Sequence, residues 1–592
     1  MKIGGADARI FSKNKGGVTV DTYKRLLKYT PEKKHCVYIS IICSALGVAC
    51  QMGAFWYLWK FLYAFLVTKS VTDGSFYATV IVALMLGYSV VYFASLWASH
   101  VLGFRLESNL RKEAIKHLMN ASFAFFDVNN SGKIRKIIDD NAQETHMIVA
   151  HLIPDNITAF LMPFLMIAVM FAVDYRLGIL LIGITVIGAI QVKWMFGNQS
   201  FLKTYKDSLD KMNAEAVEYV RGMQVIKIFK STIYSFKSFY NSIMTYSKYA
   251  IEYVYSCRTP FVIFQVIFNI VIALTVPFAI VYMNRGENLA HILARVIFFA
   301  AFGGLMFSAL MRIMYVGMYQ FQAQMVVDKF EQIFKSMEKN RLEHGSVEKF
   351  DNFDIEFKNV SFKYTEDYVL KDVSFTLAQH KTYALVGSSG GGKSTIAKLI
   401  SGFYKINEGN ILIGGRDITE YSERALLSNI AFVFQNAKLF KNVHIGNPSA
   451  SHEQVMDALE KARCTDILEK FPEREHTVIG SKGVYLSGGE TQRIAIARAI
   501  LKNANIIILD EASAAADSEN EYEIQQAFSN LMKDKTVIMI AHRLSSIRNV
   551  DEILVVDEGK IIERGSDDEL MKKDGHYKKL QTLFAKANEW KV

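Results

Sequence analysis

The chain has 592 residues, of which 51% are hydrophobic and only 21% charged, and its formal net charge is +10. This length is too great for one domain, and about two to four are expected. A basic balance can indicate nucleic-acid binding, but here the basic residues form no single patch and lie in an N-terminal arm and between apolar runs. The five cysteines include no CxxC pair, so no disulfide framework is implied. A cleavable signal peptide is not expected, because a mostly polar segment precedes the first apolar run.

The first half of the chain is built from long apolar runs. Residues 1–19 are mostly polar and glycine-bearing, which predicts a flexible N-terminus. Residues 23–29 mix basic and apolar side chains at helical spacing, as an interfacial helix does. Six runs follow, each near the roughly 20 residues that a helix needs to cross a bilayer. We place these spans at 36–66, 76–104, 157–173, 177–196, 260–283 and 289–318.

The loops between the predicted spans are strongly asymmetric. Those after the second and fourth spans, 105–156 and 197–259, are long, charged and helical in pattern, whereas the others are short. Basic residues favour the cytoplasmic side of a membrane, so the N-terminal arm and the long loops are placed there. The sequence therefore predicts a multi-pass protein of the plasma (inner) membrane with both termini in the cytoplasm.

Two segments of these long loops resemble the membrane domain of exporter-type (type IV) ABC transporters. The segment FFDVNNSGK at 125–133 is similar to the FFD…(S/T)G pattern of the first intracellular loop. The segment EAVEYVRGMQVIK at 215–227 is similar to the start of the second-loop region, whose short transverse helix docks on the ATPase domain in that family. The alternative is that both segments are ordinary solvated helical connections.

Two arginines fall within the last predicted span. A charge inside the membrane is costly unless it lines a wet cavity, and the resemblance places the sixth span beside the central cavity. Our hypothesis is that Arg295 and Arg312 attract an anionic substrate. The alternative, which we hold equal, is that they extend to an interface or pair with a carbonyl at a helix end.

The second half reads as a soluble α/β domain. A polar connector at 336–352 leads into alternating strand patterns at 355–362 and 373–377. The segment YALVGSSGGGKST at 383–395 is a strand running into GxxxxGK[ST] and then an apolar helix. In such a loop the backbone N–H groups cradle phosphates, Lys393 lies against the β- and γ-phosphates, and the Ser394 hydroxyl ligates Mg²⁺. The residues predicted to bind ATP here are Gly387, Ser388, Ser389, Gly390, Gly391, Gly392, Lys393, Ser394 and Thr395.

A second phosphate-binding element follows at 486–501. Ser487 is a good N-cap, and Gly488 and Gly489 carry no Cβ, so a phosphate can approach the start of the helix. The strand 506–511 then ends in two adjacent acids, of which Asp510 is expected to hold Mg²⁺ and Glu511 to act as general base. These segments resemble the LSGGQ signature and Walker B motif of ABC-type ATPases, with Glu490 in place of the usual glutamine.

The resemblance implies roles for three further residues. Tyr364 matches the aromatic A-loop residue that stacks on adenine, Gln435 the Q-loop residue that reaches Mg²⁺ and the attacking water, and His542 the switch histidine. The implied catalytic set is Glu511, His542 and Gln435, and the implied metal set is Ser394, Gln435 and Asp510. Ala514 stands where the D-loop usually has serine, and Ser481 and Lys482 depart from the X-loop pattern. Their effect on contacts between domains is left open.

In this family ATP lies between the Walker A motif of one ATPase domain and the signature of another. The resemblance therefore implies that Ser487, Gly488, Gly489 and Glu490 bind ATP in trans. One copy of each motif and six spans describe a half-transporter, which must form a homodimer or a heterodimer. The implied partners are a second half, the lipid bilayer and a small-molecule, peptide or lipid substrate, with no nucleic acid, and the implied cofactors are ATP and Mg²⁺.

The predicted fold is a six-helix transmembrane domain followed by a P-loop (RecA-like) α/β ATPase domain with a helical signature subdomain. The domains are a flexible N-terminus (1–19), the membrane domain (20–335), a linker (336–352) and the nucleotide-binding domain (353–588). The leading prediction is ATP-driven transport with an exporter fold. An importer of ferric siderophores is the alternative, because the LSGGE signature, the missing D-loop serine and the segments 517–521 and 132–141 resemble that subgroup. An ATP-gated channel or regulator is disfavoured by the intact Glu511.

Overall fold

A computed structural model describes residues 18–129, 131–196, 199–228, 237–273, 275–339, 341–434, 443–479, 483–510, 518–541, 547 and 550–589. The chain divides into two compact units. The first, the membrane unit, comprises Met1–Met119 and Ser131–Lys335. The second comprises Asn120–Asn130 and Ser336–Val592 and is called the ATPase unit here because it carries the predicted ATPase motifs. A short piece of the predicted range 20–335 thus belongs to the ATPase unit.

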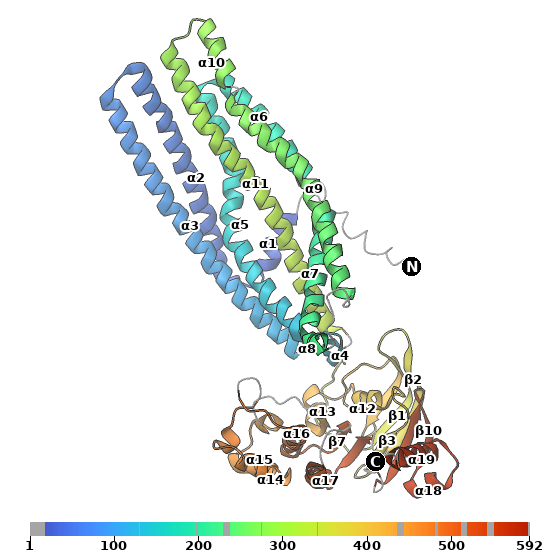
Figure 1. Cartoon of the computed structure of the whole chain (residues 1–592). Helices are drawn as coiled ribbons and strands as arrows, with labels where there is room; N and C mark the ends of the chain where they lie inside the picture. Colours follow the sequence, from blue (N-terminus) through green and yellow to red (C-terminus); the bar gives the residue numbers. More distant parts are fainter. Residues whose placement is uncertain are drawn as a thin grey trace. The chain divides into compact units, whose positions relative to one another are not determined.

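The membrane unit consists of long helices that pack along one another (Figure 1). Helix α2 packs against α3 and α5, and α6 packs against α9. The helices are α1 (Val18–Leu27), η2 (Pro31–Lys33), α2 (Lys34–Tyr63), η3 (Ala64–Thr68), α3 (Val71–Met119), α5 (Ser131–Val173), α6 (Tyr175–Phe196), α7 (Gln199–Arg221), α8 (Met223–Ile228), α9 (Lys237–Ala273), α10 (Thr275–Asn284) and α11 (Leu289–Glu338).

Four helical segments among the described residues are long and apolar enough to cross a membrane. They are Pro31–Thr68, Val71–Met119, Ile134–Val173 and Leu289–Glu338. Two shorter apolar helices, Tyr175–Gln191 and Thr275–Asn284, overlap the predicted fourth and fifth spans. The chain is therefore a membrane protein with several apolar helices, and the count of six spans stays a prediction.

The membrane helices continue well beyond the predicted apolar spans. Helix α3 extends through the charged region after residue 104, where Arg111 pairs with Glu107 one turn earlier at 2.8 Å. Leu106 and Leu110 on the same segment are buried. A charged stretch with one buried apolar face continues a helix as readily as an apolar stretch does. The long loops predicted between spans are thus largely helical, as their pattern indicates.

The junction between α5 and α6 is one residue long. Helix α5 ends at Val173 and α6 begins at Tyr175. The Asp174 carboxylate accepts a hydrogen bond from the Arg176 backbone N–H at 2.9 Å. An acidic side chain that accepts from the first backbone N–H groups of a helix is a favoured start signal. The link between the predicted third and fourth spans is therefore as short as expected, and Asp174 caps the helix that follows it.

The ATPase unit contains two sheets. One has the antiparallel order β2-β1-β4-β5, and the other has the order β10-β9-β3-β8-β7-β6. In the second sheet, pairs among β9, β3, β8, β7 and β6 are parallel, and β10 pairs antiparallel with β9. The strands are β1 (Ile355–Lys363), β2 (Tyr368–Leu377), β3 (Thr382–Val386), β4 (Glu408–Ile413), β5 (Arg416–Asp417), β6 (Ile430–Val433), β7 (Ile506–Asp510), β8 (Thr536–Ile540), β9 (Glu552–Asp557) and β10 (Lys560–Gly565).

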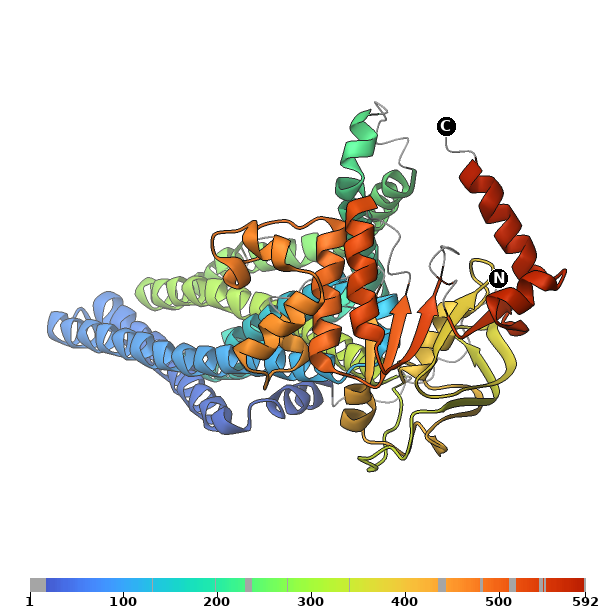
Figure 2. The same ribbon diagram turned by 90° about the horizontal axis from the view of Figure 1, so that it is seen from below.

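Helices surround the sheets of this unit, and Figure 2 shows the orange and red ones beside the strands. Helix α16 packs against α14 and α17. The helices are α4 (Phe123–Val128), α12 (Lys393–Ile400), α13 (Glu423–Asn429), η4 (Val443–Gly446), α14 (His452–Lys461), α15 (Thr465–Glu469), η5 (Arg474–His476), α16 (Gly488–Lys502), α17 (Ser518–Met532), α18 (Asp567–Lys572) and α19 (His576–Glu589).

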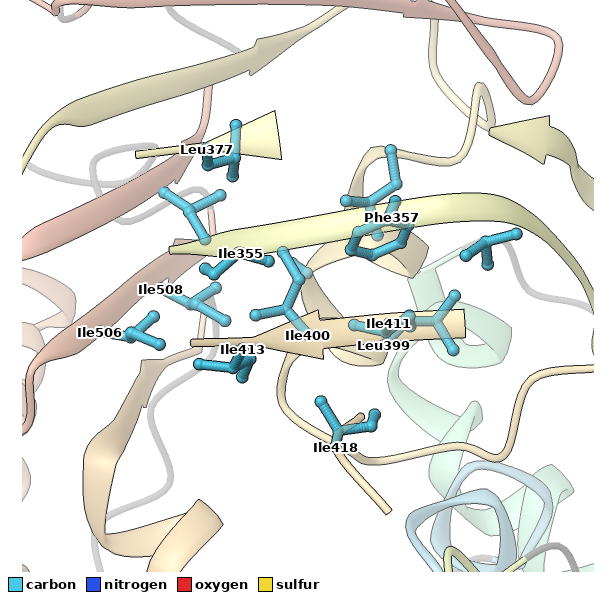
Figure 3. Packing of buried hydrophobic residues seen from close by; sticks show 14 of the residues in the cluster. Ile355, Phe357, Leu377, Leu399, Ile400, Ile411, Ile413, Ile418, Ile506 and Ile508 are labelled. Carbon is cyan, nitrogen blue, oxygen red and sulfur yellow. The ribbon is translucent and has the colours of Figure 1, made fainter. Parts of the chain in front are cut away.

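The core between the two sheets fixes the position of α12. Ile355 and Phe357 of β1 and Ile411 of β4 form one side of this core, and Leu399 and Ile400 of α12 lie among them (Figure 3). Each of these side chains is at most 1% exposed. Burial of this kind contributes roughly 1.5–3 kcal/mol per large aliphatic side chain. The helix that follows the glycine loop is thereby held firmly against the sheets.

Candidate functional site

The glycine loop joins β3 to α12 in a conformation that requires glycine. The backbone φ is +139° at Gly387 and +107° at Gly392, where L side chains are strained. A Cβ at Gly387 would lie 1.9 Å from the Val556 carbonyl oxygen, and one at Gly392 would lie 2.8 Å from a Leu370 methyl. The loop therefore curls tightly before α12 begins, as a phosphate cradle does.

Lys393 lies inside this loop. Its side-chain Nζ donates to the carbonyl oxygens of Gly387 at 3.0 Å and Ser388 at 2.6 Å, and the residue is 4% exposed. Ser388 in turn donates to the Asp557 carboxylate at 2.6 Å. The loop thus positions one ammonium group at the point where a nucleotide's phosphates would lie.

Ser394 and Asp510 meet across the edge of the parallel sheet. The Ser394 hydroxyl donates to the Asp510 carboxylate at 3.4 Å. Strands β3 and β7 both end at this edge, where ligands of open parallel sheets bind. One hydroxyl and one carboxylate oxygen beside a phosphate site match the hard oxygen ligands that Mg²⁺ prefers. No group of three His, Cys, Asp or Glu side chains suited to a metal occurs in the part of the chain that is described.

Tyr364 lies beside the phosphate loop. It follows β1 directly, the residue is 41% exposed, and its hydroxyl is 3.2 Å from the Thr395 hydroxyl. The Tyr404 ring meets it edge to face at 5.1 Å. An exposed aromatic ring held next to the loop fits a base-stacking role.

The signature segment forms the start of α16 as predicted. Ser487 is the N-cap, and its hydroxyl accepts from the Glu490 backbone N–H at 3.3 Å. The Glu490 carboxylate accepts from the Ser487 backbone N–H at 2.7 Å, which completes a capping box. Glu490 also accepts from Lys470 at 2.6 Å. Although burial alone would raise the pKa of Glu490, the bonds from Lys470 and Ser487 hold it below its ordinary value.

Sequence reasoning missed the residues that anchor this helix. Arg493, 2% exposed, donates two hydrogen bonds of 2.8 Å to the Asp466 carboxylate of α15. Lys470 follows α15 and reaches Glu490 from the same side. Each of these pairs joins residues 20 or more positions apart, so no local pattern revealed them. One signal was available in the sequence: Glu490 stands where the signature usually has glutamine, and a partly buried acid of this kind needs a basic partner.

Helix α4 is a part of the ATPase unit, although it lies between α3 and α5 in the chain. The Phe123 ring stacks on Phe403 with centroids 3.7 Å apart. The Asp127 carboxylate accepts a hydrogen bond from the Tyr404 hydroxyl and pairs with Lys398 of α12 at 3.4 Å. The segment that resembles the exporters' first intracellular loop therefore contacts α12 and the residues just after it, which follow the glycine loop.

The two arginines of the last predicted span are each ion-paired. Arg295 lies 2.6 Å from the Glu287 carboxylate and 3.4 Å from that of Asp174. Arg312 lies 3.4 Å from the Asp155 carboxylate. Their charges are thus largely balanced by acids within the membrane unit, and their role in attracting an anionic substrate stays a prediction.

Several predicted residues lie outside the described part of the chain. These are Gln435, Glu511, His542, Ala514, Ser481 and Lys482. The structure brings together Tyr364, the loop 387–395 and Asp510, and it places Ser487–Glu490 at the start of α16.

A membrane unit of long apolar helices on the same chain as a P-loop ATPase unit defines a protein that couples ATP hydrolysis to work at a membrane. Residues 37–310 match the family description "ABC transporter transmembrane region", and residues 370–514 match "ABC transporter". The chain belongs to the ABC transporter family, with fused transmembrane and ATP-binding domains. It is an ABC-type ATPase that drives transmembrane transport.

Two relatives and one solved structure illustrate the similarity. The ATP-dependent lipid A-core flippase of Photobacterium profundum is 31% identical over 581 residues, which cover 95% of this chain and 98% of the relative. The putative multidrug export ATP-binding/permease protein YgaD of Bacillus subtilis is 32% identical over 505 residues, which cover 83% of this chain and 85% of the relative. A bacterial Atm1-family ABC exporter with ATP bound matches with a TM-score of 0.74 at 24% identity, covering 93% and 98%. The predicted exporter fold is confirmed.

Proposed function

We propose that this chain is one half of a dimeric exporter that moves a lipid or another lipophilic compound across the plasma membrane. The observation that carries the proposal is the similarity to a lipid A-core flippase, which extends through the membrane region as well as the ATPase unit. A substrate is bound by membrane helices, so similarity there bears on the substrate class. The siderophore-importer alternative rests on short local features, one of which, the segment 132–141, lies in the membrane unit.

The ATP site of this exporter is shared between two chains. The phosphate loop, Ser394 and Asp510 of one chain would hold ATP and Mg²⁺, with Gln435, Glu511 and His542 completing the site. The start of α16 on the partner chain would bind the same nucleotide from the other side. The close approach of Ser394 and Asp510 at the sheet edge supports this assignment. Both termini are assigned to the cytoplasm, where ATP is available.

Reconstitution tests the transport proposal directly. The purified chain in proteoliposomes is expected to transfer a fluorescent phospholipid or a lipophilic dye between leaflets or across the membrane only when ATP is added. Lys393→Ala is the matched control, because it removes the ammonium group of the phosphate loop and should abolish the ATP-dependent part. A different result would favour import. In that case neither probe moves, a ferric chelate stimulates ATP hydrolysis, and the chelate is carried to the side of the membrane where ATP was added.

Tyr364→Ala is expected to raise the KM for ATP about 5- to 50-fold, with a smaller effect on kcat. Stacking of a base on an aromatic ring contributes roughly 1–3 kcal/mol, and Tyr364 presents an exposed ring beside Thr395. Tyr364→Phe should keep the wild-type KM within about twofold, because the ring is retained. The measurement is steady-state ATPase activity against ATP concentration.

Tyr368→Ala is the matched control for this experiment. Tyr368 is a similarly exposed tyrosine on β2, and its hydroxyl donates to Glu408. Its removal should leave the KM for ATP unchanged. Equal effects of the two alanine variants would contradict a specific role of Tyr364 in binding adenine.

A further inference from the structure

The signature of this chain carries a negative charge at the start of a phosphate-binding helix. Glu490 is the third residue of α16, and its side chain is 9% exposed. The first backbone N–H groups of a helix attract anions, and the helix dipole adds to this attraction. A carboxylate in the same turn repels a phosphate, whereas the neutral amide of glutamine does not. The substitution therefore opposes anion binding unless another group balances it.

Lys470 is the group that meets this carboxylate. Its Nζ lies 2.6 Å from the Glu490 Oε1, while the Oε2 accepts from the Ser487 backbone N–H. Lys470 is the residue after α15, and its side chain is 59% exposed. One carboxylate oxygen is thus bound by the helix cap and the other by the ammonium group.

An ion pair between α15 and α16 holds the segment that carries Lys470. Arg493, almost fully buried in α16, binds the Asp466 carboxylate of α15 through two parallel hydrogen bonds of 2.8 Å. Bidentate pairs of this kind are among the strongest charge-assisted contacts in proteins. Lys470 therefore approaches Glu490 from a segment that cannot easily move away from the signature.

We propose that Lys470 is a positioning residue for the shared ATP site. Its ammonium group neutralises Glu490 and holds that carboxylate on the helix cap, so that the first turn of α16 keeps its attraction for the nucleotide bound by the partner chain. This inference rests on the proposed function of the signature in trans. It assigns a role to a residue outside the recognised motifs.

A double-mutant cycle tests this role. Lys470→Met is expected to raise the KM for ATP about 5- to 20-fold, because an unbalanced negative charge remains beside the phosphate site. Glu490→Gln alone should change the KM by less than about threefold. In the double variant the KM should return to within about twofold of Glu490→Gln, because no charge is left to balance. The ATPase assay uses the full chain in nanodiscs.

Two further measurements separate charge balance from a merely structural effect. Lys470→Arg should restore the KM, because it returns a positive charge beside the Glu490 carboxylate. Lys461→Met is the matched control, because Lys461 pairs with Asp457 at 2.7 Å on the neighbouring α14, is similarly exposed and belongs to no motif. It should leave the KM unchanged.

Two outcomes would overturn the proposal. If Lys470→Met raises the KM equally in the wild-type chain and in the Glu490→Gln background, the lysine acts only on structure. An unchanged KM in Lys470→Met would mean that Glu490 needs no balancing charge. Lys393→Ala is measured in the same series: if it abolishes hydrolysis, the proposed ATP site stands whatever Lys470 shows, and if it does not, the ATP site itself is refuted.

Discussion

Glu511→Gln is expected to lower the ATPase rate of the reconstituted chain by at least about 100-fold while leaving ATP binding intact. A positioned general base contributes roughly 10²- to 10⁴-fold to a rate, and glutamine keeps the size of the side chain but cannot accept the proton of the attacking water. Asp510, which directly precedes Glu511, ends β7 within hydrogen-bond distance of Ser394. We therefore expect the next residue in the chain to act on water beside the γ-phosphate.

The measurement is steady-state hydrolysis in nanodiscs, with equilibrium binding of labelled ATP in parallel. Glu453→Gln is the matched control, since Glu453 is an exposed acid in the first turn of α14. Its activity should equal that of the wild type. If Glu511→Gln kept more than a tenth of the wild-type rate, another group would have to serve as the base. Activity of the wild-type chain alone would also show that a homodimer suffices.

Phe123→Ala combined with Asp127→Ala is expected to lower ATP-driven substrate transfer at least about tenfold while ATP hydrolysis changes by less than about threefold. Helix α4 is joined covalently to the membrane helices α3 and α5, yet it folds as part of the ATPase unit. Its contacts are the Phe123–Phe403 stack and the bonds of Asp127 to Tyr404 and Lys398. We expect movement of the ATPase unit to reach the membrane helices through α4, so loss of these contacts should separate transfer from hydrolysis.

Each aromatic stack contributes roughly 0.5–1.5 kcal/mol beyond the area that it buries, so the pair of substitutions should release most of this docking. Transfer of a fluorescent lipid and release of phosphate are measured on the same proteoliposomes. Val128→Ala is the matched control, because Val128 lies on the same helix and is 80% exposed. Parallel loss of transfer and hydrolysis would argue against a coupling role and for general destabilisation.

The local motifs of the ATPase unit were predictable because each motif depends on residues that are adjacent in the sequence. Gly387 and Gly392 adopt backbone angles that favour glycine. Ser487 caps α16, the helix that the spacing of apolar residues in 486–501 predicted. The six-stranded sheet brings the ends of β3 and β7 to one edge. That arrangement follows from buried apolar strands that alternate with helices.

The sequence by itself determined the family, the ATPase motifs and the existence of a helical membrane half, because glycine loops, helix caps and long apolar runs are local properties. Only the tertiary structure decided which side chains from distant parts of the chain contact one another. Asp127 binds Tyr404 across 277 positions of sequence, Lys470 balances Glu490, and Arg295 and Arg312 find carboxylates. The partner of a charged side chain is set by how whole helices pack against one another. Such pairings cannot be predicted from a short stretch of sequence, because that packing depends on residues far apart in the chain.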